Sequence, residues 1–176
     1  FRMLYGTTIY EFVLACRIDR AKELLELFLE YHPDIRFHLE IHPALLSEEL
    51  KEELKHLPEG LLHLEAGIQS LREPVLEKSR RMGKLTDALE GLKFLCSLPN
   101  METHADLIAG LPLYHLSEIF EDIRVLAAYG AGEIQLESLK LLPGTEMRRR
   151  AEELGIQYSP LPPYEVLQTR EINVSE

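Results

Sequence analysis

Residues 62–70 read Leu-His-Leu-Glu-Ala-Gly-Ile-Gln-Ser, and this stretch decides the fold. Apolar and polar residues alternate along it, which is the period of a β-strand with one buried face. One face carries only apolar side chains, namely Leu62, Leu64, Ala66 and Ile68. The other face carries His63, Glu65, Gly67 and Gln69. The pattern predicts a strand over 61–68 that packs under helices on one side and lines a polar space on the other.

The same alternation predicts strands at 35–41, 103–109 and 133–139, and a further strand is predicted at 8–14. The polar positions of the first three are His38, Glu40 and His42, then His104 and Asp106, then Glu133, Gln135 and Glu137. Parallel strands are usually apolar on both faces, and a closed eight-stranded barrel is filled with branched aliphatic side chains. A shared polar face therefore indicates a wide, ligand-filled cavity, with the site at the carboxyl ends of the strands.

Helical patterns separate the predicted strands, so the chain is α/β with a parallel sheet, either an open doubly wound sheet or a curled barrel. The helices are predicted from Asp19 to Pro33, from Ser47, from Pro74 to Arg81, over 85–98, from Ser117 to Tyr129, and over 146–154. No phosphate-binding glycine fingerprint follows a strand, which disfavours a dinucleotide site. We predict two parts, a barrel domain over 1–157 and an extended, proline-containing segment over 158–176.

Composition limits the function classes. The chain has 176 residues, 45% hydrophobic and 28% charged, which suits one folded domain. Its net charge of −11 disfavours nucleic acid and anionic membrane surfaces as partners. No apolar run has the roughly 20 residues of a membrane helix, and no signal peptide is visible, so we expect a cytoplasmic protein. Cys16 and Cys96 are too far apart to form a CxxC pair.

Four motifs together resemble the core of radical S-adenosylmethionine (SAM) enzymes. They are Gly67-Ile68-Gln69-Ser70, Asp106-Leu107-Ile108-Ala109-Gly110-Leu111-Pro112, Leu141-Leu142-Pro143-Gly144-Thr145, and Pro162-Pro163-Tyr164-Glu165-Val166-Leu167. The order and spacing are most similar to the group that carries a cobalamin-binding domain ahead of the core. The resemblance extends over 19–169 and implies a six-stranded partial (β/α) barrel of the TIM type.

The resemblance also implies an activity. Enzymes of this family use a [4Fe-4S] cluster to cleave SAM to methionine and a 5′-deoxyadenosyl radical, which abstracts hydrogen from a substrate. The cobalamin-linked group implies methyl transfer, or an oxidative cyclisation such as that of a Mg-protoporphyrin ester cyclase, on a substrate that the sequence does not identify. Carried over residue by residue, the SAM contacts are Glu40 (with Glu65 as a rival), Gln69, Arg81, Asp106, Ile108 and the Lys140 backbone.

The sequence departs from the family at one point, because it contains no CxxxCxxC motif for the cluster. The strand predicted at 8–14 then matches the family's second barrel strand. We therefore expect a fragment that begins after the cluster loop, lacks the first strand and is inactive alone. An exposed sheet edge in such a fragment favours self-association.

Two other interpretations stay open. The first is a metal-dependent barrel hydrolase, because His38, Glu40 and His42 share a strand face that His63 and His104 can join. Imidazole and carboxylate ligands suit zinc or iron. The second is a non-catalytic binding module with a degenerate core of the same family.

Overall fold

A computed structural model describes residues 20, 23–27, 29–30, 35–81 and 83–173. The predicted strand at 8–14 and Cys16 lie outside the described residues. The main sheet contains β1 (Phe37–Ile41), β2 (Leu62–Gln69), β3 (Glu102–Ala109) and β4 (Glu133–Ser138), in that spatial order. All three pairings are parallel. The four predicted strands in this part of the chain are thus confirmed, each within two residues at either end.

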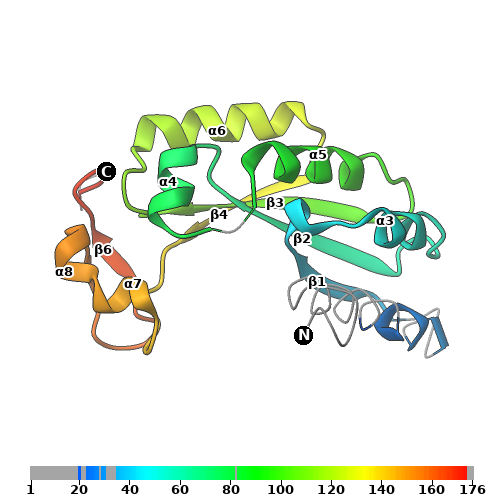
Figure 1. Cartoon of the computed structure of the whole chain (residues 1–176), viewed down its shortest axis with the longest axis horizontal. Helices are drawn as coiled ribbons and strands as arrows, with labels where there is room; N and C mark the ends of the chain where they lie inside the picture. Colours follow the sequence, from blue (N-terminus) through cyan, green and yellow to red (C-terminus); the bar gives the residue numbers. More distant parts are fainter. Residues whose placement is uncertain (1–19, 21–22, 28, 31–34, 82, 174–176) are drawn as a thin grey trace, which may run out of the picture.

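Helices cover one side of this sheet (Figure 1). They are α3 (Glu48–Lys55), α4 (Glu73–Lys78), α5 (Leu85–Cys96) and α6 (Leu116–Ala128), with the short η1 (Pro43–Leu45) after β1. The main core lies between sheet and helices and includes Leu64 of β2, Leu92 of α5 and Leu126 of α6, all almost fully buried. The apolar strand faces therefore pack under helices, as the alternation predicts.

Of two predicted helix starts, one agrees with the structure and the other is one residue too late. Ser47 is the N-cap of α3, as predicted, and its hydroxyl accepts a hydrogen bond from the Leu50 amide at 3.2 Å. The prediction that Ser117 opens the helix running to Tyr129 is wrong, because α6 begins one residue earlier with His115 as its N-cap. The Glu118 carboxylate accepts from the His115 amide at 3.0 Å, which ties down this end of the helix.

The C-terminal part forms a small unit at one end of the sheet (Figure 1). It contains α7 (Glu146–Arg149), α8 (Ala151–Leu154), β5 (Gln157–Tyr158) and β6 (Val166–Gln168). The last two strands pair in antiparallel fashion and form a short ribbon. An isolated bridge between Lys140 and Glu165 joins the ribbon to the chain that follows β4. The domain boundary between 157 and 158 stays a prediction, and it falls within β5.

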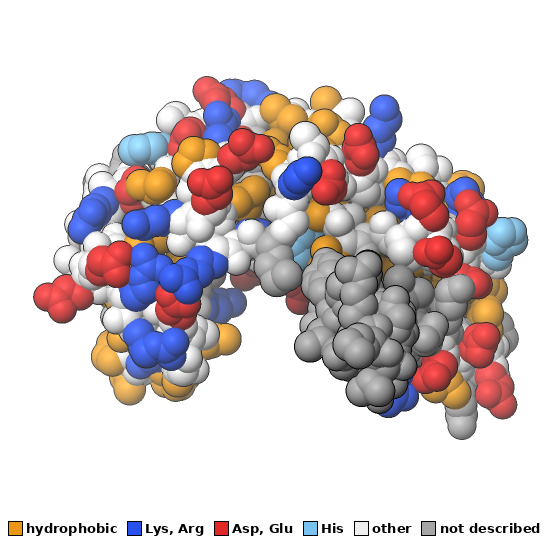
Figure 2. All heavy atoms as spheres, in the orientation of Figure 1, with side chains coloured by type: hydrophobic (Ala, Val, Ile, Leu, Met, Phe, Trp, Pro, Cys, Tyr) orange, Lys and Arg blue, Asp and Glu red, His pale blue; other side chains and the backbone are white. Residues whose placement is uncertain are grey.

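The polar side of the sheet faces away from α5 and α6. Along β2 the buried residues alternate with half-buried ones up to Ala66, with the polar residues at the half-buried positions. Figure 2 shows the molecule hollowed beside the C-terminal unit. In the described part of the chain, no helix combines the length and the apolar character needed to cross a membrane.

Candidate functional site

A guanidinium lies over a glycine at the carboxyl end of β2. The Nη2 atom of Arg81 donates to the carbonyl oxygen of Gly67 at 2.7 Å. A Cβ atom on Gly67 would lie 3.0 Å from the same Nη2 and 3.7 Å from Oε1 of Glu40. Glycine therefore lets the cation from beyond α4 and the carboxylate from β1 approach the same point of the strand. Arg81 and Glu40 therefore lie near each other beside Gly67, although no ion pair links these two described residues directly.

Burial lowers the pKa of Arg81, and the negative charge of Glu40 opposes that shift. A guanidinium stays protonated under all ordinary conditions. Its five N–H donors allow it to bind a carboxylate in addition to the Gly67 carbonyl. This part of the site can therefore bind a ligand with a carboxylate and an ammonium group.

Gln69 ends β2 in a strained backbone conformation. Its φ is +69°, in the left-handed region that non-glycine residues seldom adopt. The pairing of β2 with β3 also shifts register between Gly67 and Gln69. Irregularities of this kind redirect a side chain at a strand end and are common beside functional sites. The sequence places Gln69 on the polar face. The register shift indicates that Gln69 belongs to the candidate site at the carboxyl ends of the strands.

Asp106 of β3 is the cross-strand neighbour of Gly67 and is only 7% exposed. Its Oδ1 atom has no hydrogen-bond partner among the described residues and lies 3.3 Å from Nε2 of His104. Burial, a hydrogen bond to Glu65 and nearby negative charge raise the pKa of Asp106 to about 8. The same hydrogen bond lowers the pKa of Glu65. Near neutral pH the two carboxyl groups therefore share a proton, which Asp106 carries.

This shared proton gives a pH prediction. Because the folded pKa of Asp106 lies above the unfolded value, the folded chain binds more protons between about pH 4 and pH 8, and its stability falls as pH rises through that range. Asp106→Asn removes this dependence. We compare urea unfolding of the two proteins in the presence of EDTA. Between pH 5 and pH 8, we expect the free energy of unfolding of the unmodified chain to fall, relative to that of the variant, by an amount on the order of a few kcal/mol. Parallel pH profiles for the two proteins would contradict the assignment.

Ile108 and Lys140 lie further along the same edge. Ile108 is half-buried and packs with the apolar cluster that includes Val75 and Tyr114. The Lys140 backbone bridges to Glu165, while its Nζ lies 3.3 Å from a carboxylate oxygen of Glu137. A cavity of about 100 Å³ opens here, between the ends of β3 and β4 and the ribbon, lined by Ala109, Gly110, Ser138, Val166, Leu167, Gln168, Thr169 and Ile172. The structure thus brings Glu40 and Arg81 together at Gly67, with Asp106 beside them. Ile108 and Lys140 lie at the other end of the edge.

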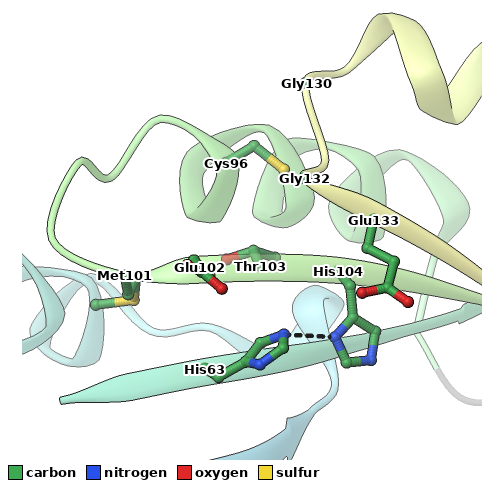
Figure 3. Close-up of a pocket in the computed structure, with 9 residues that line it drawn as sticks. All are labelled: His63, Cys96, Met101, Glu102, Thr103, His104, Gly130, Gly132 and Glu133. Atoms are coloured by element: carbon green, nitrogen blue, oxygen red, sulfur yellow. Dashed lines mark hydrogen bonds between the residues drawn. The ribbon is translucent and has the colours of Figure 1, made fainter. Parts of the chain in front are cut away.

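The histidines predicted as alternative metal ligands come together only in part. His38, Glu65 and His104 each place a ligand atom within 4.8 Å of the other two. Glu40 is instead the neighbour of Arg81, and the His42 ring lies beside Gly83. At the amino ends of the strands, His63 and His104 line a pocket of about 420 Å³ (Figure 3).

Sequence reasoning missed the role of Gly67 and of the ribbon residue Val166. A glycine inside a strand often marks a close approach by another group, so Gly67 carried a usable signal. Val166 belongs to one of the motifs, but the sequence does not place it beside Gly110, because that contact depends on a ribbon that pairs across the chain.

The chain resembles known proteins in its three-dimensional structure but not detectably in its sequence. No protein-family model and no curated protein matches the chain. Solved structures do match it. One is the radical SAM methyltransferase TsrM from Kitasatospora setae with tryptophan substrate and the SAM analogue aza-SAM bound, at a TM-score of 0.63 and 18% identity over 89% of this chain. The same enzyme with cobalamin and a [4Fe-4S] cluster bound gives a TM-score of 0.62 and 17% identity over 91% of this chain.

A third match is coproporphyrinogen III oxidase (HemN) from Escherichia coli, a radical SAM enzyme, at a TM-score of 0.54 and 17% identity. It covers 79% of this chain and 38% of its own length. The present chain spans about a third of TsrM, since it covers 33% of that protein in both structures. These likenesses show that the chain has the partial-barrel fold of the radical SAM enzymes.

Proposed function

We propose that this chain is part of a radical SAM enzyme and that the carboxyl edge of its sheet binds SAM. One observation carries the proposal: Arg81 and Glu40 both lie beside Gly67, next to the buried Asp106, in a fold shared with enzymes that bind SAM. SAM contains an amino-acid zwitterion and a ribose diol. At the carboxyl ends of the strands, Arg81 and Glu40 suit the zwitterion and Asp106 suits the diol.

Arg81 binds the carboxylate of SAM, and Glu40 accepts hydrogen bonds from its ammonium group. Gln69 provides a polar contact to the methionine or ribose part. The Oδ1 atom of Asp106, which lacks a partner among the described residues, accepts from a ribose hydroxyl. Ile108 and the Lys140 backbone lie around the adenine.

In this family a reduced [4Fe-4S] cluster supplies the electron that cleaves SAM. Among the described residues the only cysteine is Cys96, on α5. Burial raises the pKa of its thiol, whereas a cluster ligand must be a thiolate. The described residues therefore do not fit the cluster, and their role is to hold and orient SAM.

For the whole enzyme we propose a cobalamin-linked reaction, either methyl transfer or oxidative cyclisation. The supporting observation is the match to TsrM, a methyltransferase with cobalamin and a [4Fe-4S] cluster bound. The match to HemN, which is named for a porphyrinogen substrate, supports the cyclisation alternative.

Equilibrium dialysis with radiolabelled SAM tests the binding site. We expect measurable binding by the chain and a loss of about tenfold or more in Arg81→Ala, because a hydrogen bond to a charged group contributes about 1.5–3 kcal/mol. Asp106→Ala is expected to have a similar effect. Arg80→Ala is the matched control, because this neighbouring arginine pairs with Glu146 of α7 instead.

The same dialysis is repeated on the protein that the full gene encodes, reconstituted anaerobically with iron and sulfide. Equal SAM affinity in the Arg81→Ala and Arg80→Ala variants would contradict the site. Failure of the full protein to bind iron would contradict the proposed enzyme class.

A further inference from the structure

We propose that His38, Glu65 and His104 form a binding site for a divalent transition-metal ion, with Zn²⁺ as the best-suited ion. The three side chains come from β1, β2 and β3 on the polar face of the sheet. Two imidazoles and one carboxylate are the donor set of open zinc sites, which leave a position for water or a ligand. The proposal is independent of SAM binding.

The donor atoms are already close to the spacing that the ion requires. Nε2 of His38 lies 3.0 Å from Oε2 of Glu65, and Nε2 of His104 lies 3.6 Å from the same oxygen. All three ligand atoms fall within 4.8 Å of one another. Zinc–donor distances of about 2.0–2.2 Å place tetrahedral ligands about 3.3–3.6 Å apart. A small rotation of the exposed His38 side chain closes the remaining gap.

His104 provides the observation that points to a ligand. The residue is 3% exposed, and its Nε2 atom has no hydrogen-bond partner among the described residues. That nitrogen points instead toward oxygens of Glu65 and Asp106, at 3.6 Å and 3.3 Å. A buried polar atom without a partner is costly, and a cation bound between this nitrogen and the Glu65 carboxylate removes that cost.

His63 holds the His104 ring in place. Nδ1 of His104 and Nε2 of His63 are 2.8 Å apart, as Figure 3 shows. When His104 donates this hydrogen bond, its Nε2 carries the lone pair that a metal ion needs. Metal-binding histidines usually donate their second ring nitrogen in this way, which sets the tautomer and the ring orientation. The three rings of His38, His63 and His104 lie with centroids 4.8–5.5 Å apart.

A pocket at the amino ends of the strands borders one of the three proposed ligands, His104. The pocket of about 420 Å³ is lined by His63 and His104 together with Glu102 and Glu133. Glu133 is the cross-strand neighbour of His104, and its carboxylate points toward that ring in Figure 3. The Glu102 carboxylate pairs with Arg36, and Glu133 adds a negative charge on the His104 side of the pocket.

The site lies beside the SAM edge but does not coincide with it. On β2, Glu65 precedes Gly67 by two residues, and on β3, His104 precedes Asp106 by two residues. The metal site is therefore nearer to the amino ends of these strands. An ion held there would face the polar cavity and could bind a substrate group.

The test is a metal titration of the 176-residue chain. After removal of metal with a chelator, the chain is dialysed against Zn²⁺ and measured by atomic spectrometry, and a parallel Co²⁺ titration is followed through its visible absorption. We expect one ion per chain with intense bands of four-coordinate cobalt. His38→Ala and Glu65→Gln are each expected to weaken binding at least tenfold, while His38→Cys keeps zinc because thiolate is also a zinc ligand.

Two controls keep the outcome decisive. His56→Ala removes an exposed histidine whose ring bonds to the Glu52 carbonyl of α3, and we expect no change in metal binding. Arg81→Ala should keep its zinc even where it loses SAM, which separates failure of this proposal from failure of the SAM site. Circular dichroism verifies that each variant is folded. A chain that binds no stoichiometric Zn²⁺ at micromolar concentration, or whose binding survives both His38→Ala and Glu65→Gln, would overturn the proposal.

Discussion

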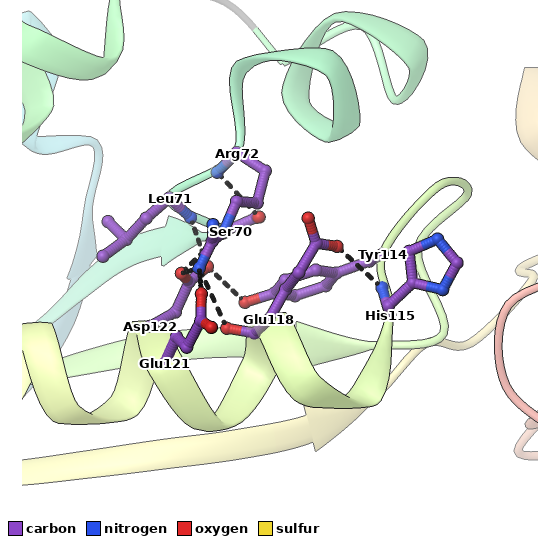
Figure 4. A network of polar contacts seen from close by, with 8 residues as sticks. All are labelled: Ser70, Leu71, Arg72, Tyr114, His115, Glu118, Glu121 and Asp122. Atoms are coloured by element: carbon purple, nitrogen blue, oxygen red, sulfur yellow. Dashed lines mark hydrogen bonds and ion pairs between the residues drawn. The ribbon is translucent and has the colours of Figure 1, made fainter.

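Replacing Asp122 with alanine is expected to lower the free energy of unfolding by about 3–5 kcal/mol, the cost of removing one partner from a buried ion pair. Asp122 of α6 is 1% exposed, and it is the acceptor at the centre of the network in Figure 4. Its carboxylate accepts from the Leu71 amide at 2.8 Å, from Nε of Arg72 at 2.9 Å and from the Tyr114 hydroxyl at 2.6 Å. Removal leaves three donors without their acceptor.

This network positions the candidate site. Leu71 and Arg72 lie two and three residues after Gln69, so Asp122 anchors to α6 the loop that leaves the bulged end of β2. Burial and Asp122 together raise the pKa of Tyr114, which therefore stays a hydrogen-bond donor at any physiological pH. The alanine variant is expected to bind SAM more weakly as well as to unfold more easily.

Glu121→Ala is the matched control for Asp122→Ala. Glu121 is the next residue along α6, and its exposed carboxylate pairs with the same Arg72 guanidinium at 2.8 Å. Exposed ion pairs contribute about 0–1 kcal/mol, so we expect urea unfolding of this variant to be almost unchanged. Similar midpoints for Asp122→Ala and Glu121→Ala would show that the network is not a structural anchor.

The fold was largely predictable because the alternation on each strand is a local signal. Leu64 and Glu65 take their opposite faces from strand geometry alone, whatever lies elsewhere in the chain. The same rule places His38, Glu65 and His104 on one face. It does not predict which of the polar side chains meet, since that depends on the register between strands. His104 faces Glu65 rather than Glu40 because β2 lies between β1 and β3.

The parts that escaped prediction are contacts between segments distant in sequence. Asp122 reads as an ordinary polar residue of a helix, and only the fold brings it to Leu71, 51 residues away. The ribbon of β5 and β6 escaped for a similar reason, because strands of two and three residues are too short to show a period. Buried polar networks and short strand pairs are therefore the features that the sequence alone did not predict.

Gly91→Ala is expected to have the largest effect of any single added methyl group. Gly91 lies in the middle of α5, where η1 crosses it at the shortest approach of any described glycine. A Cβ atom at this position would lie 2.1 Å from the carbonyl oxygen of Pro43 and 2.8 Å from its carbonyl carbon. These are backbone atoms of a buried residue, so no side-chain rotation relieves the clash. Alanine normally stabilises a helix against glycine by about 1 kcal/mol, and here the clash reverses that sign.

We expect Gly91→Ala to lower the free energy of unfolding by about 3 kcal/mol or more, at or beyond the upper end for overpacked cores, as measured by urea unfolding. Glu40 precedes Pro43 by three residues, so a displaced η1 also moves the carboxylate that lies near Arg81, and SAM binding should fall with stability. Gly132→Ala is the control, because a Cβ there meets only the Thr103 carbonyl oxygen at 3.7 Å, an ordinary contact. If the two alanine variants unfold at the same urea concentration, α5 does not pack against Pro43 as described, and the position of Glu40 must be set by other contacts.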